Sequence, residues 1–181
     1  MELALNPSLD AEALAGAYRA RKRVQIRDFL SERSATAVLA ELEKLDWGLA
    51  YNDGSRVVQL EPEAVRQLGQ VEAADIMAGI HERARSGYQF FYAYFPILNA
   101  YFSPEAPQFG IFDFYELINS EPVLDLVRAV TGLETIRWAD GQATWFKPGN
   151  FLKAHTDEET TERRLAAYVM NLSPEWERDW G

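Results

Sequence analysis

The stretch that decides the fold prediction is FKPGNFLKAHTDEETTERRLAAYVMNLSPEW, residues 146–176. It contains short apolar runs bounded by turn residues, with a His-Thr-Asp triplet between them. Apolar runs separated by Pro-Gly, acidic and Ser-Pro segments predict consecutive short antiparallel strands. Side chains at positions i and i+2 of a strand point to the same face, so His155 and Asp157 would present an imidazole and a carboxylate together.

This His-x-Asp triplet has two interpretations. The simpler one is a histidine at the end of a strand, beside a solvated acidic turn. The other is a pair of ligands from a two-histidine, one-carboxylate site, which holds ferrous iron and leaves coordination positions open. The chain contains no cysteine, so thiolate metal sites and disulfides are excluded, and the donor set suits Fe(II) better than structural zinc.

Four motifs follow one another in a fixed order, and the second of them contains the triplet: WFKPGNF, LKAHTD, RRLAAYVMNLSPEW and ERDWG. This order resembles the iron(II)/2-oxoglutarate-dependent dioxygenases, in particular their prolyl 4-hydroxylase-like branch. The resemblance implies an α+β fold with a double-stranded β-helix core, jelly-roll or cupin-like, which is incomplete here and carries N-terminal supporting helices. It places the first part of that core at residues 134–181 and a helix-rich support region with several strands at 1–133, within one continuous domain.

The resemblance also implies a set of site residues. His155 and Asp157 would be the metal-binding, catalytic pair, while the family's third ligand, a later histidine, and its 2-oxoglutarate-binding Arg or Lys have no counterpart in the printed sequence. Asn171 and Tyr168 would bind 2-oxoglutarate, since an amide and a phenol can donate to a carboxylate. Arg164 and Lys147 are candidates for substrate contact. A surface ion pair for the arginine and a solvated turn for the lysine are the simpler alternatives.

The function implied is hydroxylation of an amino-acid or peptidyl substrate of the prolyl type, with release of succinate and CO2. The cofactors are Fe(II) and the cosubstrate 2-oxoglutarate, with ascorbate as a reductant. The alternative is a truncated or non-catalytic jelly-roll domain that acts in binding or assembly. Because the printed sequence stops before the family's last strands, we expect a fragment, or a homodimer formed through an open sheet edge.

Charge and composition exclude other classes of protein. The formal net charge is −10 and the pI is about 4.7, which predicts no nucleic-acid partner, since such binding needs a basic surface. No apolar run is long enough to span a bilayer, so we expect no membrane partner, and no signal peptide opens the chain. The absence of cysteine is typical of a cytoplasmic protein.

Upstream of residue 134, capping residues and hydrophobic periodicity predict alternating helices and strands. In chain order these are a helix from the cap Asp10 to Arg21, a strand at 24–26, a helix capped by Ser31, two strands within 47–60, one helix from Pro62 to Arg85, a buried strand in YQFFYAYFPI (88–97), and two helices within 113–131 broken at Pro122. His81 falls near the end of the long helix, where a surface histidine is the expected role.

Overall fold

The computed structural model describes residues 2–54, 56–104, 110–156 and 164–177. The chain forms two compact units, and each unit is assembled from separate stretches. Unit 1 consists of Met1–Lys44, Ala100–Asp140 and Glu158–Gly181, and unit 2 of Leu45–Asn99 and Gly141–Asp157. The predicted division of the chain into a support region, 1–133, and the first part of a dioxygenase core, 134–181, stays a prediction.

Unit 2 is built on an antiparallel sheet. Its strands run in the order β2-β1-β3-β4, and β5 also pairs with β3. Their bounds are β1 Gly48–Asp53, β2 Arg56–Leu60, β3 Phe90–Phe95, β4 Ala143–Trp145 and β5 Phe151–Leu152. The two strands predicted around the Asn-Asp-Gly turn are confirmed as β1 and β2. Gly54 in that turn has φ 66°, a left-handed conformation that glycine adopts without steric cost.

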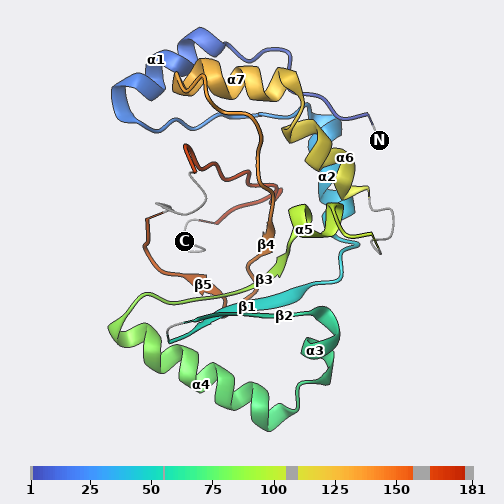
Figure 1. Ribbon diagram of the computed structural model, residues 1–181, viewed down its shortest axis with the longest axis vertical. Coiled ribbons are helices and arrows are strands. Elements are labelled where there is room, and N and C mark those ends of the chain that lie inside the picture. Colours follow the sequence, from blue (N-terminus) through green and yellow to red (C-terminus); the bar gives the residue numbers. More distant parts are fainter. Residues whose placement is uncertain (1, 55, 105–109, 157–163, 178–181) are drawn as a thin grey trace. The chain divides into compact units, whose positions relative to one another are not determined.

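Two helices lie on one side of this sheet (Figure 1). They are α3, Pro62–Gln67, and α4, Gln70–Ser86. The prediction of one continuous helix was wrong, because Leu68 and Gly69 are extended, with ψ of 121° and 153°, and interrupt the helical hydrogen bonds. Gly87 ends α4 as expected. The side chain of Ile80 on α4 is fully buried, and the helix contacts β1 and β3.

The buried strand predicted within residues 88–97 is confirmed as β3. Phe90 and Tyr94 of this strand form a buried cluster with Ala50 of β1, and Tyr92 packs against it. Gly48 of β1 faces Tyr94 so closely that an added Cβ would lie 2.7 Å from the tyrosine ring. The sheet therefore packs around its central strand, whose aromatic side chains dominate the core.

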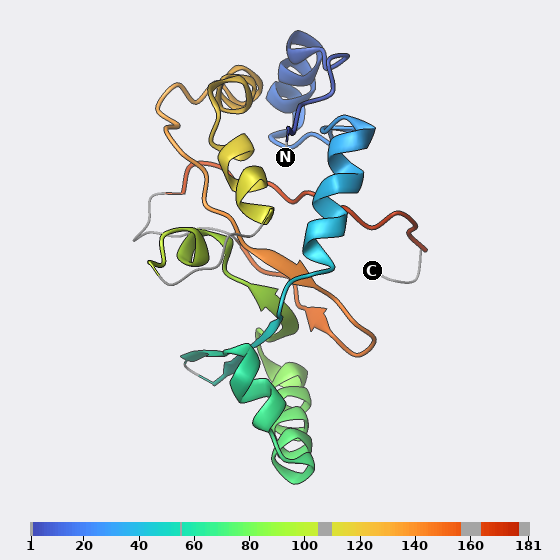
Figure 2. The ribbon, with the colours of Figure 1, turned by 90° about the vertical axis from the view of Figure 1, so that its right-hand side faces the viewer.

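The described helices of unit 1 are α1 Ala11–Arg21, α2 Glu32–Leu42, α6 Ile111–Ile118 and α7 Glu121–Thr131. Both predicted N-caps are confirmed: Asp10 accepts a hydrogen bond from the Ala13 N–H, and Ser31 accepts one from the Ser34 N–H. Helix α1 contacts α7, and α2 lies beside α6 (Figure 2). A short helix α5, Ile97–Tyr101, follows β3.

The predicted break at Pro122 lies slightly earlier in the chain. Helix α6 ends at Ile118, and Pro122 belongs to the first turn of α7. A proline is tolerated there because the first N–H groups of a helix have no intrahelical partner. Proline thus marks the start of the second helix here, and residues 119–120 make the break.

Two predicted strands are wrong. Residues 24–26 form no strand, and the neighbouring Leu30 makes only an isolated bridge to Leu5. Residues 164–172 form no strand either, although their composition is apolar. In both places the described part of the chain offers no second strand with which the stretch could pair, and a strand is not stable alone.

The combination of helices with an antiparallel sheet confirms the α+β class. The jelly-roll or cupin-like core is a finer prediction, which the described strands do not establish. Within the described ranges, no helix is both long and apolar enough to cross a membrane.

Candidate functional site

His155 lies in unit 2, and its side chain is exposed. The strand predicted to reach it was too long, because β5 ends at Leu152 and residues 153–156 form no strand. Its Nδ1 atom is 3.1 Å from the backbone carbonyl oxygen of Lys153. A carbonyl oxygen can only accept a hydrogen bond, so Nδ1 carries the proton in this contact. In the neutral ring the lone pair is then on Nε2, which is the arrangement found in metal-ligating histidines whose other nitrogen donates to a carbonyl.

Lys153 connects this segment to helix α4. Its Nζ donates to the carbonyl oxygens of Ala84 and Gly87, at 2.6 Å each, and its backbone N–H donates to the Gln89 carbonyl at 3.1 Å. The last carbonyls of a helix have no intrahelical donor, and a lysine ammonium there satisfies them and complements the helix dipole. The backbone that precedes His155 is therefore tied to α4.

A row of aromatic rings extends from His155 across unit 2. The ring centroids of His155 and Tyr88 are 5.7 Å apart, followed by Tyr88 to Phe90 at 5.8 Å, Phe90 to Tyr92 at 5.2 Å, and Tyr92 to Phe146 at 5.4 Å. These separations are typical of favourable aromatic pairs. Burial raises the pKa of Tyr92, and a hydrogen bond with Gln142 partly offsets that rise. His155 thus stands at the end of a row of aromatic side chains, of which Phe90 is buried in the core.

The predicted second ligand, Asp157, lies outside the described residues. Within the described ranges, no three His, Asp or Glu side chains are grouped so that they could hold a metal ion. His81 lies on α4 with an exposed side chain, and its ring centroid is 6.2 Å from that of Phe151. The iron site predicted from His155 and Asp157 stays a prediction.

Three of the predicted contact residues belong to unit 1. Arg164 places Nη2 3.4 Å from Asp140 Oδ2. Burial, with a smaller contribution from the Asp140 carboxylate, raises the pKa of Tyr168 to about 12. The side-chain oxygen of Asn171 accepts a hydrogen bond from the Ser173 N–H at 2.9 Å, so this side chain stabilises a local turn. The structure therefore brings Arg164 and Tyr168 to one carboxylate.

Lys147 lies in the turn between β4 and β5. Its backbone N–H donates to Asn150 Oδ1 at 2.9 Å, and Gly149 has φ 88°. Its Nζ lies 4.1 Å from the centroid of the Trp145 ring, which is a cation–π distance. These contacts agree with the simpler expectation of a turn residue, and a substrate contact by Lys147 stays a prediction.

Asp140, which no sequence motif singled out, lies beside Arg164 and Tyr168 in unit 1. Asn119 holds the adjacent backbone: its Oδ1 accepts from the Ala139 N–H at 2.8 Å, and its Nδ2 donates to the Ala139 carbonyl at 3.1 Å. The Asp140 carboxylate also contributes, after burial, to a raised pKa at Tyr115. The signal in the sequence was weak, because an Asp-Gly pair usually marks only a turn.

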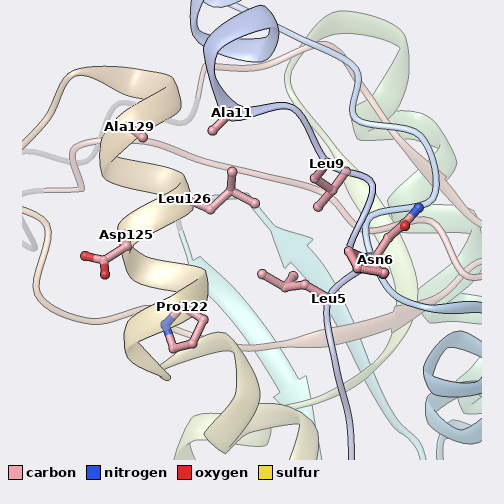
Figure 3. A pocket seen from close by; sticks show the side chains of 9 residues that line it. Leu5, Asn6, Leu9, Ala11, Pro122, Asp125, Leu126 and Ala129 are labelled. Carbon is pink, nitrogen blue, oxygen red and sulfur yellow. The ribbon is translucent and has the colours of Figure 1, made fainter.

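Unit 1 also has an open pocket of about 420 Å³ between the N-terminal segment and α7. Figure 3 shows Leu5 and Leu9 on one side and Leu126 on the other, while the Asp125 carboxylate points away from them. Among the described residues that line it, Asp125 alone is ionisable, and it pairs with Arg128 at 2.7 Å. A catalytic site needs several convergent polar groups, so this lining does not resemble one.

Compared with known proteins, the chain matches no protein-family model, no curated protein and no solved structure. The proposal for its function therefore depends on the sequence motifs and on the local geometry around His155.

Proposed function

We propose that this chain belongs to an Fe(II)- and 2-oxoglutarate-dependent dioxygenase that hydroxylates an amino-acid or peptidyl substrate of the prolyl type. The observation that supports this best is the contact between His155 Nδ1 and the Lys153 carbonyl oxygen, at 3.1 Å. It orients the imidazole as metal ligands are usually oriented, at the position where the dioxygenase-like motif needs one. The proposal includes a double-stranded β-helix as the complete core.

The donor set fits ferrous iron in its chemistry. His155 would supply an imidazole and Asp157 a carboxylate, and the chain contains no thiolate that would favour zinc. The third ligand would be a histidine that the printed sequence does not supply downstream. When bound, iron and 2-oxoglutarate would supply the oxidation of a C–H bond, with release of succinate and CO2.

The protein residues would hold and shield the reactants. Lys153 fixes the course of the backbone before His155, and the aromatic row that begins at Tyr88 provides an apolar wall next to the imidazole. Asn171 and Tyr168 would donate hydrogen bonds to 2-oxoglutarate. Arg164 and Lys147 would contact the substrate, and ascorbate would keep the metal reduced.

Metal binding tests the proposal directly. Titration of the protein with Mn(II), followed by calorimetry, should detect binding that His155→Ala weakens by more than about tenfold, since even the partners of metal ligands contribute about that much. His81→Ala is the matched control, because it removes the other exposed imidazole of unit 2. Equal affinities of the His155→Ala variant and the unaltered protein would refute the site.

The cosubstrate provides a second test. With Fe(II) and oxygen present, the chain that carries the full ligand set should convert 2-oxoglutarate to succinate. Asn171→Leu should raise the 2-oxoglutarate concentration needed, without changing Mn(II) affinity, because a leucine cannot donate to the carboxylate. A change in metal affinity with an unchanged 2-oxoglutarate requirement would contradict this assignment of Asn171.

A non-catalytic role in binding or assembly is the second candidate. The stretch 164–172 supports it, because Leu165 and Val169 are exposed there, Val169 by 95%. Apolar side chains grouped on a surface often mark an interaction site. Light scattering should then give a mass above 20.6 kDa, and Val169→Glu should restore the monomer. A monomeric unaltered protein would exclude self-assembly through this stretch.

A further inference from the structure

The stretch RARKRVQIR, residues 19–27, carries five cationic side chains and no acidic one, in a chain whose net charge is −10. We call it the basic segment. It begins in the last turn of α1 and continues beyond that helix, and all five cationic residues are exposed. These residues are Arg19, Arg21, Lys22, Arg23 and Arg27. Such a density of one charge is unusual in an acidic protein.

Cationic residues elsewhere in the described chain usually have a carboxylate partner. Seven of them form ion pairs: Lys44, Arg56, Arg66, Arg83, Arg85, Arg128 and Arg164. By contrast, no cation of the basic segment pairs with a carboxylate of the described residues. Arg19 and Arg21 lie in the last turn of α1 and complement its dipole. Arg23 and Arg27 lie beyond the helix, so the dipole does not account for them.

The N–H groups of residues 23–27 also lack a backbone partner in the described part of the chain, and Arg27 begins a turn with Asp28. Val24 and Ile26 are half-buried, while Arg23, Gln25 and Arg27 are exposed, which is the alternation of a strand at the surface. Yet none of these five N–H groups donates to a backbone carbonyl of the described residues. The stretch therefore has the side-chain alternation of a strand, although it forms none, and an edge of N–H groups without a backbone partner in the described residues.

Contacts at both ends hold this edge in place. The Lys22 N–H donates to the Tyr18 carbonyl at 2.7 Å, and Leu30 forms a bridge with Leu5. Lys22 and Asp28 have positive φ values of 57° and 49°, which are uncommon outside glycine and bracket the stretch with defined turns. An edge whose ends are anchored loses less conformational entropy when a partner pairs with it.

We infer that residues 23–27 bind an extended acidic peptide of a partner protein, which pairs with this edge as an added strand. Backbone hydrogen bonds would supply the pairing, and alternate carboxylates of the peptide would lie opposite Arg23 and Arg27. Arginine favours carboxylates because its guanidinium can donate two parallel hydrogen bonds. The net charge of −10 opposes long polyanions such as nucleic acid, whereas a short peptide can contact the basic segment alone.

The test uses a fluorescein-labelled peptide of about twelve residues with alternating Glu and Val, long enough to cover the edge. Fluorescence anisotropy should report binding that weakens as salt is added. Arg23→Glu should lower the affinity about fivefold or more, since like charges then face each other. Arg33→Glu is the matched control, because Arg33 is an exposed arginine on α2 with no ion pair in the described residues.

A second variant separates strand pairing from charge attraction. Gln25→Pro keeps every charge but removes an N–H from the edge, and it should also weaken binding. Circular dichroism would verify that each variant is folded. Unaltered binding by Gln25→Pro or by Arg23→Glu would overturn the inference, and so would a single-stranded oligonucleotide that displaces the peptide at lower concentration. No step uses a metal, so these results are independent of the proposed oxygenase.

Discussion

Strand β3, Phe90–Phe95, and the stretch 164–172 have similar apolar compositions but different structures. β3 pairs with β1 on one edge and with β4 and β5 on the other. Residues 164–172 form no strand, and Val169 is 95% exposed. Apolar composition therefore permits a strand, whereas partners with matching register produce one.

The strands that pair with β3 lie at different distances from it along the sequence. β1 and β2 form a hairpin through a short Asp-Gly turn, which closes at little entropic cost. β4 and β5 are about fifty residues beyond β3 and are joined to each other by the Lys147–Asn150 turn. Pairing with these strands gives the backbone of β3 its hydrogen bonds. It also gives the aromatic side chains of β3 neighbours to pack against.

The largest difference in stability between the two regions is expected at Tyr94, which is only 1% exposed. Tyr94→Ala should reduce the free energy of unfolding by about 3–5 kcal/mol, because it leaves a cavity beside Phe90 and Ala50. Val169→Ala, in the unpaired stretch, should change it by less than about 0.5 kcal/mol. Urea denaturation measures both. Comparable losses would mean that the two stretches are equally packed.

Alkaline pH should distinguish the same two regions through their tyrosines. Burial, followed by the charge of Glu61, raises the pKa of Tyr94 to about 12. The unfolded phenol titrates near 10.0, so the unfolded state loses its proton first and stability should fall by about 1.4 kcal/mol per pH unit between pH 10 and 12. Below pH 10 this group should have no effect.

Tyr94→Phe should remove much of that alkaline loss, as measured by urea denaturation across this pH range. Tyr168→Phe is the matched variant in unit 1, since its pKa is also raised to about 12. Its effect should be smaller: burial raises the pKa of the Tyr168 phenol, but the residue as a whole is 48% exposed, against 1% for Tyr94, so water offsets part of the cost of ionising it. A larger effect at Tyr168 would reverse the order of burial assigned to the two residues.

Gly48 tests the close approach of β1 to β3 and β2. An alanine Cβ there would lie 2.6 Å from the Leu60 carbonyl oxygen and 2.7 Å from the Tyr94 ring. Gly48→Ala should therefore destabilise the protein by about 1–3 kcal/mol in thermal or urea unfolding. Gly69→Ala is the control, because an added Cβ there meets no atom within 4 Å. If the two variants unfolded alike, the register of β1 against β3 would be in question.

The smallest effect is expected where β5 is tied to α4. Lys153→Met keeps the aliphatic stem but leaves the Ala84 and Gly87 carbonyl oxygens without this donor. The cost should be about 1–2 kcal/mol. Lys147→Met, which removes only an exposed ammonium over Trp145, should cost less than about 1 kcal/mol. Hydrogen exchange at Leu152 should speed up in the first variant only, and equal rates would show that Lys153 does not hold the strand.

Local signals predicted the elements that depend on near neighbours. Asp10 and Ser31 cap helices because their side-chain oxygens reach an N–H three residues later. The long helix after Pro62 was predicted without its break, because nothing in the local periodicity distinguishes Leu68 as extended. For the candidate site, a strand was predicted to extend through His155, but β5 ends at Leu152. The interaction of Lys153 with α4 was not predicted.

The sequence by itself determined the helix caps, the β1–β2 turn, the buried strand β3 and the chemical nature of the His155 side chain. These follow from side-chain chemistry and from spacings of a few residues, which act in any folded context. Only the tertiary structure decided that residues 24–26 and 164–172 form no strand, and that Arg164 and Tyr168 both lie near the Asp140 carboxylate. Such outcomes depend on which distant segments come into contact. The hydrophobic periodicity of a segment does not reveal which distant segment will form hydrogen bonds with it.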